Sequence, residues 1–498
     1  DPGGGGGAAA AQNAKLAAIT PLFSASHVHD VFFHNNAFKL DFYLRYVHLM
    51  TRPTTLWAQF CLAYEVIRFE RKLSRNLVRC LGMHKLHHKC GLPVLFKYNP
   101  RPQSRFWKNR DYSDARPHSP PALIATGWHD LFLGGALNDY KGLVEAHGAG
   151  HAQLMVGPWH HLESVLSFSA FKTLLQKSVS FLQEKTGLAK ATSGEKLPVH
   201  LWVMGKRAHQ GYWQDFSAWP PNEVSDELLL LGFRTLGTDG CLDQHPAAQQ
   251  RSCIVYDPRD PTPAVGGSVF SPMDAGEKMQ NSLESRGDVL LFDSEPFATS
   301  VTIVGHTRLR LLIRASRPHF DVFARLCDVH PGTGRSYNVC DAAVRHRGPS
   351  ERSLSHQEVP RLQTFDEERP CTVTVELTFA ATAKSFGPGH RLRLLIAGGA
   401  FPNYARHFGD MEQNPENEPL EVHPTSLEVL HTEQMPSALW IPVLASSPDE
   451  ASPRSPISRC WPGSPRSLAQ AATTRPARWP KKQFADSLRK VQSEAVVT

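Results

Sequence analysis

The chain has 498 residues, a formal net charge of +7, 41% apolar residues and 20% charged residues. This length exceeds what one hydrophobic core usually organises, so we expect two or three compact units. The composition is ordinary for a globular protein, and no apolar run reaches the roughly 18 residues that span a bilayer, so no membrane partner is expected. Basic residues form no stripe interleaved with aromatic residues, which argues against nucleic acid as a partner.

The nine cysteines are an odd number without regular spacing. This argues against a disulfide scaffold and favours reduced, buried thiols in a reducing compartment such as the cytoplasm. His84, His87, His88 and Cys90 stand at spacings that a zinc ion accepts, but no second pair of ligands follows them. We therefore expect a basic surface stretch there, and neither a metal nor a cofactor. The oligomeric state is left open.

The first part of the chain predicts an incomplete α/β unit. It opens at Asp1, and the glycine run at residues 3–7 does not belong to a signal peptide, so we expect the sequence to begin inside a longer protein. A short apolar run at residues 15–21 (KLAAITP) suits a buried parallel strand. Over residues 38–81 apolar side chains recur at helical spacing, which predicts a helical, mostly surface segment.

Two compact apolar runs follow, at residues 121–126 (PALIAT) and 152–156 (AQLMV). Each is stopped by glycine and followed by a helical pattern, through residue 144 and over residues 162–185 respectively. The order strand, helix, strand, helix predicts a parallel, doubly wound sheet.

After residue 197 the period of the apolar residues changes from 3.6 to 2. In residues 372–379 (TVTVELTF) four apolar side chains alternate with polar ones, and we expect the apolar set to be buried together with the threonines exposed. Many short strands between Gly and Pro turns predict an antiparallel sandwich over residues 197–444. From residue 445 onward Pro, Ser and Arg dominate, which predicts a disordered tail.

Two short motifs stand just past the carboxyl ends of the two predicted parallel strands. They are GWHD at residues 127–130 and GPWHH at residues 157–161. Open α/β sheets build their sites at these strand ends. An imidazole that takes a proton from a nucleophile needs a carboxylate to fix its tautomer, and the order acid before base matches α/β-hydrolases. Without further context, the residue types alone favour the plainer interpretation, in which Asp130 is a helix N-cap and His161 a satisfied polar residue.

The context is a resemblance to a known family. PALIATGWHDLFLGG and HAQLMVGPWHH resemble the paired motifs of the cocaine esterase and Xaa-Pro dipeptidyl-peptidase family of α/β-hydrolases. The resemblance implies that Asp130 is the catalytic acid and His161 the catalytic base. We expect His161, rather than His160, to reach the Asp130 carboxylate. Trp128, His129 and Trp159, which flank the pair in the motifs, are the expected binding residues.

The resemblance extends over roughly residues 13–444. FWKNRDYSD at residues 106–114 resembles the family's segment before the acid strand. YDPRDPTPAVGG, DVFARLCDVHP and AGGAFPNYARH resemble its C-terminal jelly-roll. The implied organisation is a partial α/β-hydrolase sheet with a helical cap insertion, followed by a β jelly-roll domain. The expected parts are residues 1–29 and 115–190 for the hydrolase, 30–114 for the cap, 197–444 for the jelly-roll and 445–498 for the tail.

The implied function is that of a serine hydrolase, which cleaves acyl esters or Xaa-Pro peptides through an acyl-enzyme. The family's Gly-x-Ser-x-x-Gly elbow should precede residues 15–21, but that stretch contains no serine. The first serines, Ser24 and Ser26, follow the predicted strand. We therefore expect no nucleophile in this chain and no activity from it, owing either to an N-terminal truncation or to loss of the catalytic machinery. The alternative is a non-catalytic binding protein that uses the jelly-roll and the remaining pocket.

Overall fold

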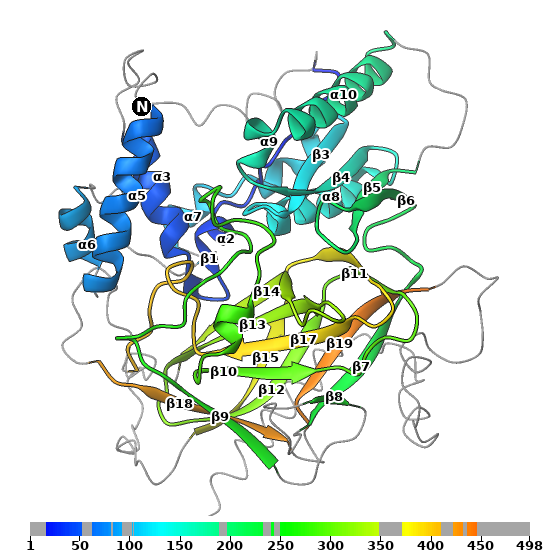
Figure 1. The fold of residues 1–498 in the computed structure, drawn as a ribbon. Helices are drawn as coiled ribbons and strands as arrows, with labels where there is room; N and C mark the ends of the chain where they lie inside the picture. The colour runs from blue at the N-terminus through cyan, green and yellow to red at the C-terminus, as the bar shows by residue number, and fades with distance from the viewer. Residues whose placement is uncertain are drawn as a thin grey trace, which may run out of the picture. The chain divides into compact units, whose positions relative to one another are not determined.

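The computed structural model describes residues 16–51, 62–80, 83–91, 102, 104–188, 197–232, 241–243, 250–347, 371–409, 422–431 and 436–445. All of them belong to one compact unit, residues 1–460 (Figure 1). A second unit, residues 461–498, lies outside the described residues, as does the predicted tail beyond Ala445. None of the described helices has the length and apolar character needed to cross a bilayer.

A parallel sheet forms the centre of the first part of the chain. Strand β3 (Ala122–His129) pairs in parallel with β4 (Ala152–His160). The segment that contains Ile19 and Leu22 lies along the other edge of β3, also in parallel. Its backbone hydrogen bonds to the start of β3 run from Ile19 to Phe23. The strand predicted at residues 15–21 is thus found as a short bridged segment, here called the edge strand, that continues beyond Pro21, although Lys15 lies outside the described residues.

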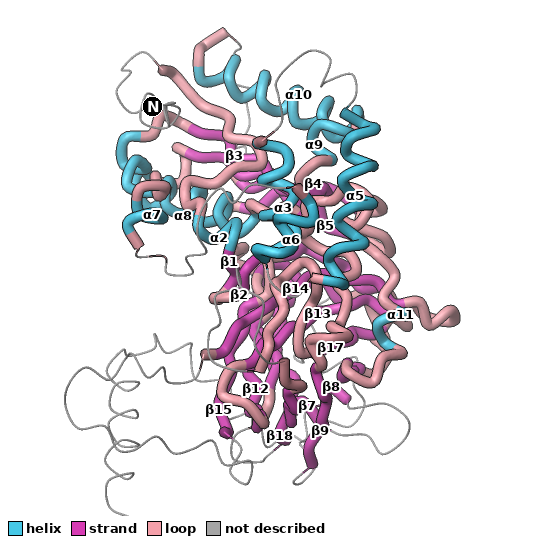
Figure 2. The backbone as a smooth tube through the Cα atoms, turned by 90° about the vertical axis from the view of Figure 1, so that its left-hand side faces the viewer, coloured by secondary structure: helices cyan, strands magenta, loops and turns pink. Residues whose placement is uncertain are grey.

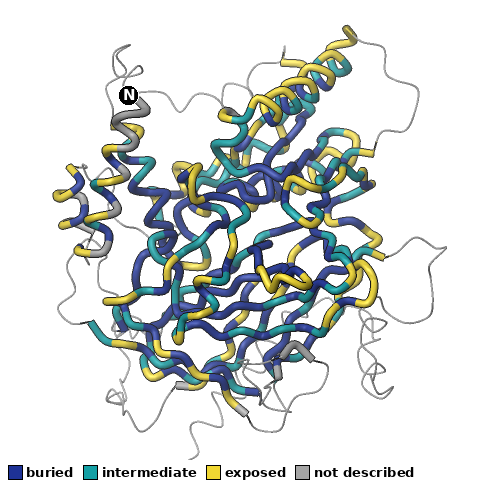
Figure 3. The backbone as a smooth tube through the Cα atoms, viewed as in Figure 1, coloured by how far each residue is buried: buried dark blue, intermediate teal, exposed yellow. Residues whose placement is uncertain are grey.

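Helices cover both faces of this sheet. Helix α8 (Leu133–His147) packs on one face, where Ile124, Leu154 and Val156 share its hydrophobic core. Helix α10 (Phe168–Lys185) packs on the opposite face with a second core. That core receives the alternate strand residues Leu123, Ala125 and Met155. The sheet is therefore covered on both faces, which explains why β3 is buried at every position while the outer side of α10 is exposed (Figure 3).

The sheet continues further than expected. Strand β5 (Val199–Met204) pairs in parallel with β4, and β6 (Gly211–Phe216) pairs antiparallel with β5. Residues 199–204, which fall within the antiparallel sandwich predicted over residues 197–444, thus lie in the parallel sheet. Val199, Leu201 and Val203 are buried in the same core as α8, because that face of the sheet would otherwise be open beyond β4. The domain boundaries themselves stay predictions.

A helical segment with its own core lies between the edge strand and β3. The elements are α2 (His29–Phe32), β1 (Phe33–His34), β2 (Ala37–Phe38), α3 (Leu40–Met50), α5 (Leu62–Arg79), α6 (Met83–Cys90), α7 (Arg105–Lys108) and the 3-10 helix η1 (Ser113–His118). Phe32, Phe33 and Trp107 meet in an aromatic cluster at its centre, and Leu73 of α5 is fully buried beside them. This burial explains why a strongly basic stretch still forms helices that pack.

The rest of the described chain is a β domain, which Figure 2 shows as a group of strands with few helices. Its strands are β7 (Val224–Gly232), β8 (Cys241–Asp243), β9 (Gln250–Tyr256), β10 (Val289–Asp293), β11 (Val301–Gly305), β12 (Arg308–Ala315), β13 (Phe320–Val329), β14 (Ser336–His346), β15 (Cys371–Thr378), β16 (Thr382–Phe386), β17 (Arg391–Ala397), β18 (Thr425–His431) and β19 (Ala438–Leu444).

The β domain is built almost entirely of antiparallel pairs. Strands β10, β17, β13 and β14 follow one another in one group. In a second group β15 pairs with β12, which pairs with β18 and β19, and these pair with β9 and β7. Parallel contacts within the domain, among the described strands, are limited to a single residue pair between β10 and β8. The long-range antiparallel pairing agrees with the period of 2 in the sequence.

Strand β15 shows the predicted alternation. Val375, Leu377 and the following Phe379 are buried, whereas Thr372 and Thr374 are exposed. Val373 is only partly buried, because it lies near the end of the strand, where it pairs with Ile313. The prediction of a buried apolar face and an exposed threonine face is confirmed for this strand.

We expect Leu377→Ala to destabilise the protein by about 2 to 5 kcal/mol, since Leu377 is 2% exposed and truncation leaves a cavity. Thr378→Ala is the matched control, because the next side chain of the same strand is exposed. It should change stability by less than about 0.5 kcal/mol. Urea unfolding followed by tryptophan fluorescence measures both. Equal effects of the two changes would contradict the assigned face.

Candidate active site

Asp130 lies just after the end of β3, where the backbone turns into α8. Its amide donates a hydrogen bond to the Gly127 carbonyl at 3.0 Å. The Thr126 hydroxyl donates to Oδ2 of the carboxylate at 2.7 Å. The side chain has no exposed surface. The carboxylate is therefore held in one orientation, with Oδ1 left for another partner.

That partner is His161, one residue beyond β4. Its Nδ1 lies 2.9 Å from Oδ1 of Asp130. His160 instead faces Glu163, with its Nε2 at 3.8 Å from Oε2. The prediction that His161 and not His160 reaches the carboxylate is confirmed. The imidazole is 21% exposed, and within the described part of the chain its Nε2 has no hydrogen-bond partner.

Three aromatic rings surround the His161 imidazole. The ring centroids of Phe132, Phe270 and Phe23 lie 5.1, 5.8 and 6.1 Å from its own. Phe132 leads into α8 and Phe23 comes from the edge strand, whereas Phe270 comes from a loop of the β domain. The imidazole thus packs against aromatic side chains from three separate parts of the chain and stays partly exposed.

Two residues near the Asp130–His161 pair could not be predicted from the sequence. Nothing local in the sequence connects Phe270 with His161, because they meet only through the packing of distant segments. Lys39, between β2 and α3, is a second such residue. Burial lowers the pKa of its ammonium group to about 8, although the charges of Asp30 and Asp130 act in the opposite direction. Lys39 thus places a positive charge within electrostatic reach of the candidate acid.

Two glycines in these motifs lie where a side chain would clash with Trp159. A Cβ at Gly127 would lie 2.1 Å from the Trp159 carbonyl oxygen, and one at Gly157 would lie 2.4 Å from the Trp159 ring. The register of β3 and β4 also shifts between Gly127 and His129. The two strand ends therefore come closer together than residues with side chains would permit, and Asp130 and His161 follow directly from them.

The three predicted binding residues are buried. Trp128 donates from Nε1 to the Trp202 carbonyl at 2.7 Å, and Trp159 packs with Phe23 and Trp213. His129 is 3% exposed. The observed contacts of Trp128 and Trp159 are those of core packing beside the Asp130–His161 pair. Their role in binding stays a prediction.

His129 is electrostatically unusual. Burial lowers its pKa to about 3, and the positive charges of His160, His209, Arg325 and Lys384 act in the same direction. Within the described chain its buried Nε2 has no hydrogen-bond partner. His129 is therefore neutral at physiological pH, and it adds no positive charge beside Asp130.

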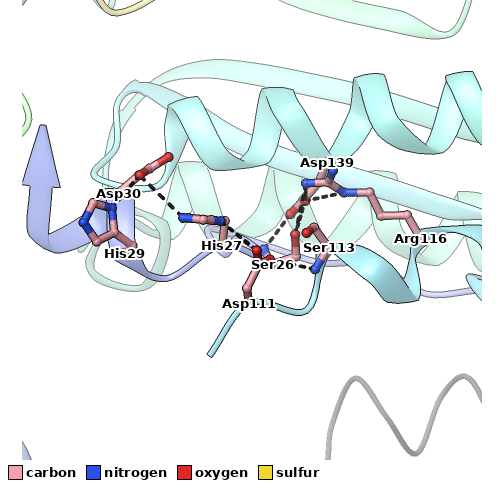
Figure 4. A network of polar contacts seen from close by, with 8 residues as sticks. All are labelled: Ser26, His27, His29, Asp30, Asp111, Ser113, Arg116 and Asp139. Carbon is pink, nitrogen blue, oxygen red and sulfur yellow. Dashed lines mark hydrogen bonds and ion pairs between the residues drawn. The ribbon is translucent and has the colours of Figure 1, made fainter. Parts of the chain in front are cut away.

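Neither of the first two serines is placed as a nucleophile. The Ser26 hydroxyl donates to Oδ1 of Asp139 at 2.5 Å and accepts a hydrogen bond from Arg116 at 3.2 Å (Figure 4). Ser24 is exposed, and it follows the edge strand without a turn into a helix. The structure thus brings together the predicted acid and base, and it assigns Ser26 to a different polar network.

A sheet with parallel strands, helices on both faces and a paired carboxylate and imidazole at successive strand ends is typical of an α/β-hydrolase, here joined to a C-terminal β domain. Residues 5–163 match the family model of X-Pro dipeptidyl-peptidase (S15 family). Residues 194–439 match the model of the X-Pro dipeptidyl-peptidase C-terminal non-catalytic domain. The chain belongs to this family of hydrolases.

Named relatives agree with the family. The chain is 29% identical to the cocaine esterase of Rhodococcus sp. over 65% of its own length and 56% of the esterase. It is 24% identical to a putative serine esterase of Mycobacterium bovis over 56% of its length and 47% of that protein. The chain therefore spans about half the length of these curated relatives.

Solved structures agree in fold. An aminopeptidase from a marine sediment Thaumarchaeota archaeon matches with a TM-score of 0.68 at 18% identity, over 86% of this chain and 72% of that one. An α-amino acid ester hydrolase matches with a TM-score of 0.65 at 19% identity, over 88% and 74%. At these identities the likeness concerns the fold.

We expect Gly127→Ala to destabilise the protein by more than about 2 kcal/mol, because its Cβ would meet backbone rather than a movable side chain. Gly134→Ala, in α8, is the matched control, since nothing lies within 4 Å of the position that its new methyl group would occupy. It should be neutral or stabilise by up to about 1 kcal/mol. Thermal unfolding measures both. A tolerated Gly127→Ala would contradict the close approach of the strand ends.

We expect the free energy of unfolding to fall as the pH drops from about 6 to 4. The uptake of one proton by His129 on unfolding contributes to this pH dependence. Its pKa is lowered in the folded chain, so between these values the unfolded chain binds the extra proton and stability is lost with falling pH. His129→Gln should reduce the slope of unfolding free energy by about 1.4 kcal/mol per pH unit. Urea midpoints measured across this range test it, with the exposed His118→Gln as the control. An unchanged slope in His129→Gln would show that this histidine is protonated in the fold.

Proposed function

We propose that Asp130 and His161 are the acid and base of a serine hydrolase that acts on acyl esters or Xaa-Pro peptides. The observation that carries the proposal is the 2.9 Å contact between Nδ1 of His161 and Oδ1 of a buried Asp130, at the ends of adjacent parallel strands. Membership in the hydrolase family supports it, as do the esterase relatives.

The geometry suits general base catalysis. The carboxylate accepts the Nδ1 proton and so fixes the tautomer in which Nε2 carries the lone pair. That nitrogen is the one without a partner in the described chain, and it can take the proton of an attacking hydroxyl. Because the carboxylate is buried, it stabilises the imidazolium that forms without competition from water.

The proposal extends to the nucleophile. No serine precedes Ser24, and the Ser26 hydroxyl is engaged by Asp139, so we propose that the 498-residue chain by itself does not form an acyl-enzyme. The chain then supplies the acid and the base of the catalytic triad, but not the serine. The alternative, a binding protein without turnover, rests on the same lack of a serine placed as a nucleophile.

The roles of the pair can be tested in a chimera. The N-terminal part of the Rhodococcus cocaine esterase that carries its nucleophile is joined to this chain upstream of the edge strand. We expect hydrolysis of activated acyl esters, with a kcat that falls about 10,000-fold or more in Asp130→Asn and in His161→Ala, because the base is lost or misoriented.

His160→Ala is the control in that chimera, because it removes the neighbouring imidazole, which faces Glu163 rather than Asp130. It should retain activity within about tenfold, with folding checked by circular dichroism. If His160→Ala abolishes turnover and His161→Ala does not, the assignment of the base is wrong. A folded chimera that binds an ester analogue without turning it over favours the non-catalytic alternative.

The chain itself is tested with a fluorophosphonate probe. We expect neither labelling nor a burst of product from p-nitrophenyl esters, because a hydroxyl hydrogen-bonded to Asp139 is not activated by His161. Stoichiometric labelling at Ser24 or Ser26 that disappears in His161→Ala would show that the nucleophile lies within this chain.

A further inference from the structure

We propose that His27, His29 and Asp30 bind a divalent transition metal, with Zn²⁺ as the best match. The three side chains lie where the chain leaves the parallel sheet and enters the helical segment, away from the Asp130–His161 pair in the sequence. One nitrogen from each histidine and one carboxylate oxygen all lie within 4.8 Å of one another. Figure 4 shows the His27 and His29 rings on either side of the Asp30 carboxylate.

The spacing of the donor atoms fits a tetrahedral ion. Zinc lies about 2.0 to 2.1 Å from nitrogen or carboxylate oxygen, so two ligands of a tetrahedron are about 3.3 Å apart. Oδ1 of Asp30 lies 2.9 Å from Nδ1 of His29 and 3.7 Å from Nε2 of His27, on either side of this value. An ion would take the place of the proton that Asp30 and His29 now share.

The types of the three side chains and their exposure also suit a zinc ion. Two imidazoles and one carboxylate are a ligand set that zinc sites use with water in the fourth position. The His29 side chain is 7% exposed and held between Phe33 and Trp107, whereas that of Asp30 is 59% exposed. The ligands are thus fixed on the protein side, and an ion can enter from solvent on the other.

Asp111 supplies the outer contact that metal-binding histidines usually make. Its Oδ2 lies 3.2 Å from Nδ1 of His27, while its Oδ1 accepts a hydrogen bond from the Ser113 amide at 3.0 Å. The carboxylate therefore holds the Nδ1 proton of His27 and leaves Nε2 to face Asp30. A carboxylate behind a ligating imidazole orients the ring and makes it a better donor.

The site joins the two ends of the helical segment. His27 lies at its beginning, Asp111 lies near its end, and the two residues also form a backbone bridge. A bound ion would hold the first turn of α2 to this junction through His29 and Asp30. Such an ion would join the beginning of the helical segment to its end, with the fourth position left to water.

A second group with ligand-like spacing is a weaker candidate. Asp328, His330 and His390 of the β domain are all buried, and no other such group occurs among the described residues. However, the Lys384 ammonium group lies 2.8 Å from Oδ2 of Asp328 and already neutralises the carboxylate. A cation there would have to displace an ammonium group in a region closed to solvent, which opposes binding.

The test is Zn²⁺ binding by the full 498-residue chain after removal of metal with a chelator. Competition with a chromophoric zinc indicator should show one equivalent bound with submicromolar affinity. Asp30→Asn and His27→Ala should each weaken binding by more than about tenfold, and Asp111→Asn by about 10 to 100-fold. Because Asp30 is largely exposed, Asp30→Asn is expected to leave the fold intact, which circular dichroism checks. Cobalt(II) in the same site should give the absorption of a tetrahedral complex.

His200→Ala is the matched control. This histidine also contacts a carboxylate, that of Asp215, but among the described residues it belongs to no group of three ligands, so its removal should leave the affinity unchanged. The proposal is overturned if the chain binds no zinc at this level, or if Asp30→Asn and His27→Ala bind as tightly as the parent. It is equally overturned if binding survives these changes and is lost in His330→Ala, which would place the ion in the β domain.

Discussion

The parallel pairing of β3 with β4 is the constraint on which the candidate site depends. Parallel strands end at the same edge of a sheet, so residues 31 positions apart in the chain, Asp130 and His161, leave the sheet side by side. The pairing is tight because Gly127 lets the Trp159 backbone approach where a Cβ would clash. Backbone geometry thus places the candidate acid and base next to each other.

Burial of the Asp130 carboxylate determines how strongly it interacts with His161. A carboxylate with no exposed surface is costly to ionise unless its oxygens are satisfied, and here Thr126 and His161 each bind one of them. Lys39 adds a positive charge within electrostatic reach, whereas the neighbouring His129 stays neutral because burial lowers its pKa to about 3. The low dielectric that imposes the cost also strengthens the attraction between Asp130 and an imidazolium at His161.

The sequence predicts what depends on local pattern. The apolar runs before Gly127 and Gly157 form the first parts of β3 and β4, although both strands continue through the glycines that were expected to stop them, and the alternation around Leu377 gives the buried face of β15. It does not predict what depends on long-range packing. Nothing near residue 199 says that β5 will pair with β4 rather than with a strand of the β domain, and Phe270 reaches His161 only because the β domain packs there. Such contacts are set by the whole fold, and a single sequence carries no local signal for them.

The start of the helical segment is tied to α8, the helix that follows the candidate acid. Ser26 binds Asp139 of α8 through both its amide and its hydroxyl, and Arg116, near the other end of the segment, binds the same carboxylate at 2.8 Å. Helix α8 begins three residues after Asp130. Asp139 and the turn that holds Asp130 therefore lie on one continuous stretch of backbone. Because the hydrogen bonds to Asp139 are charge-assisted and partly buried, they fix the helical segment to the helix that directly follows the candidate acid.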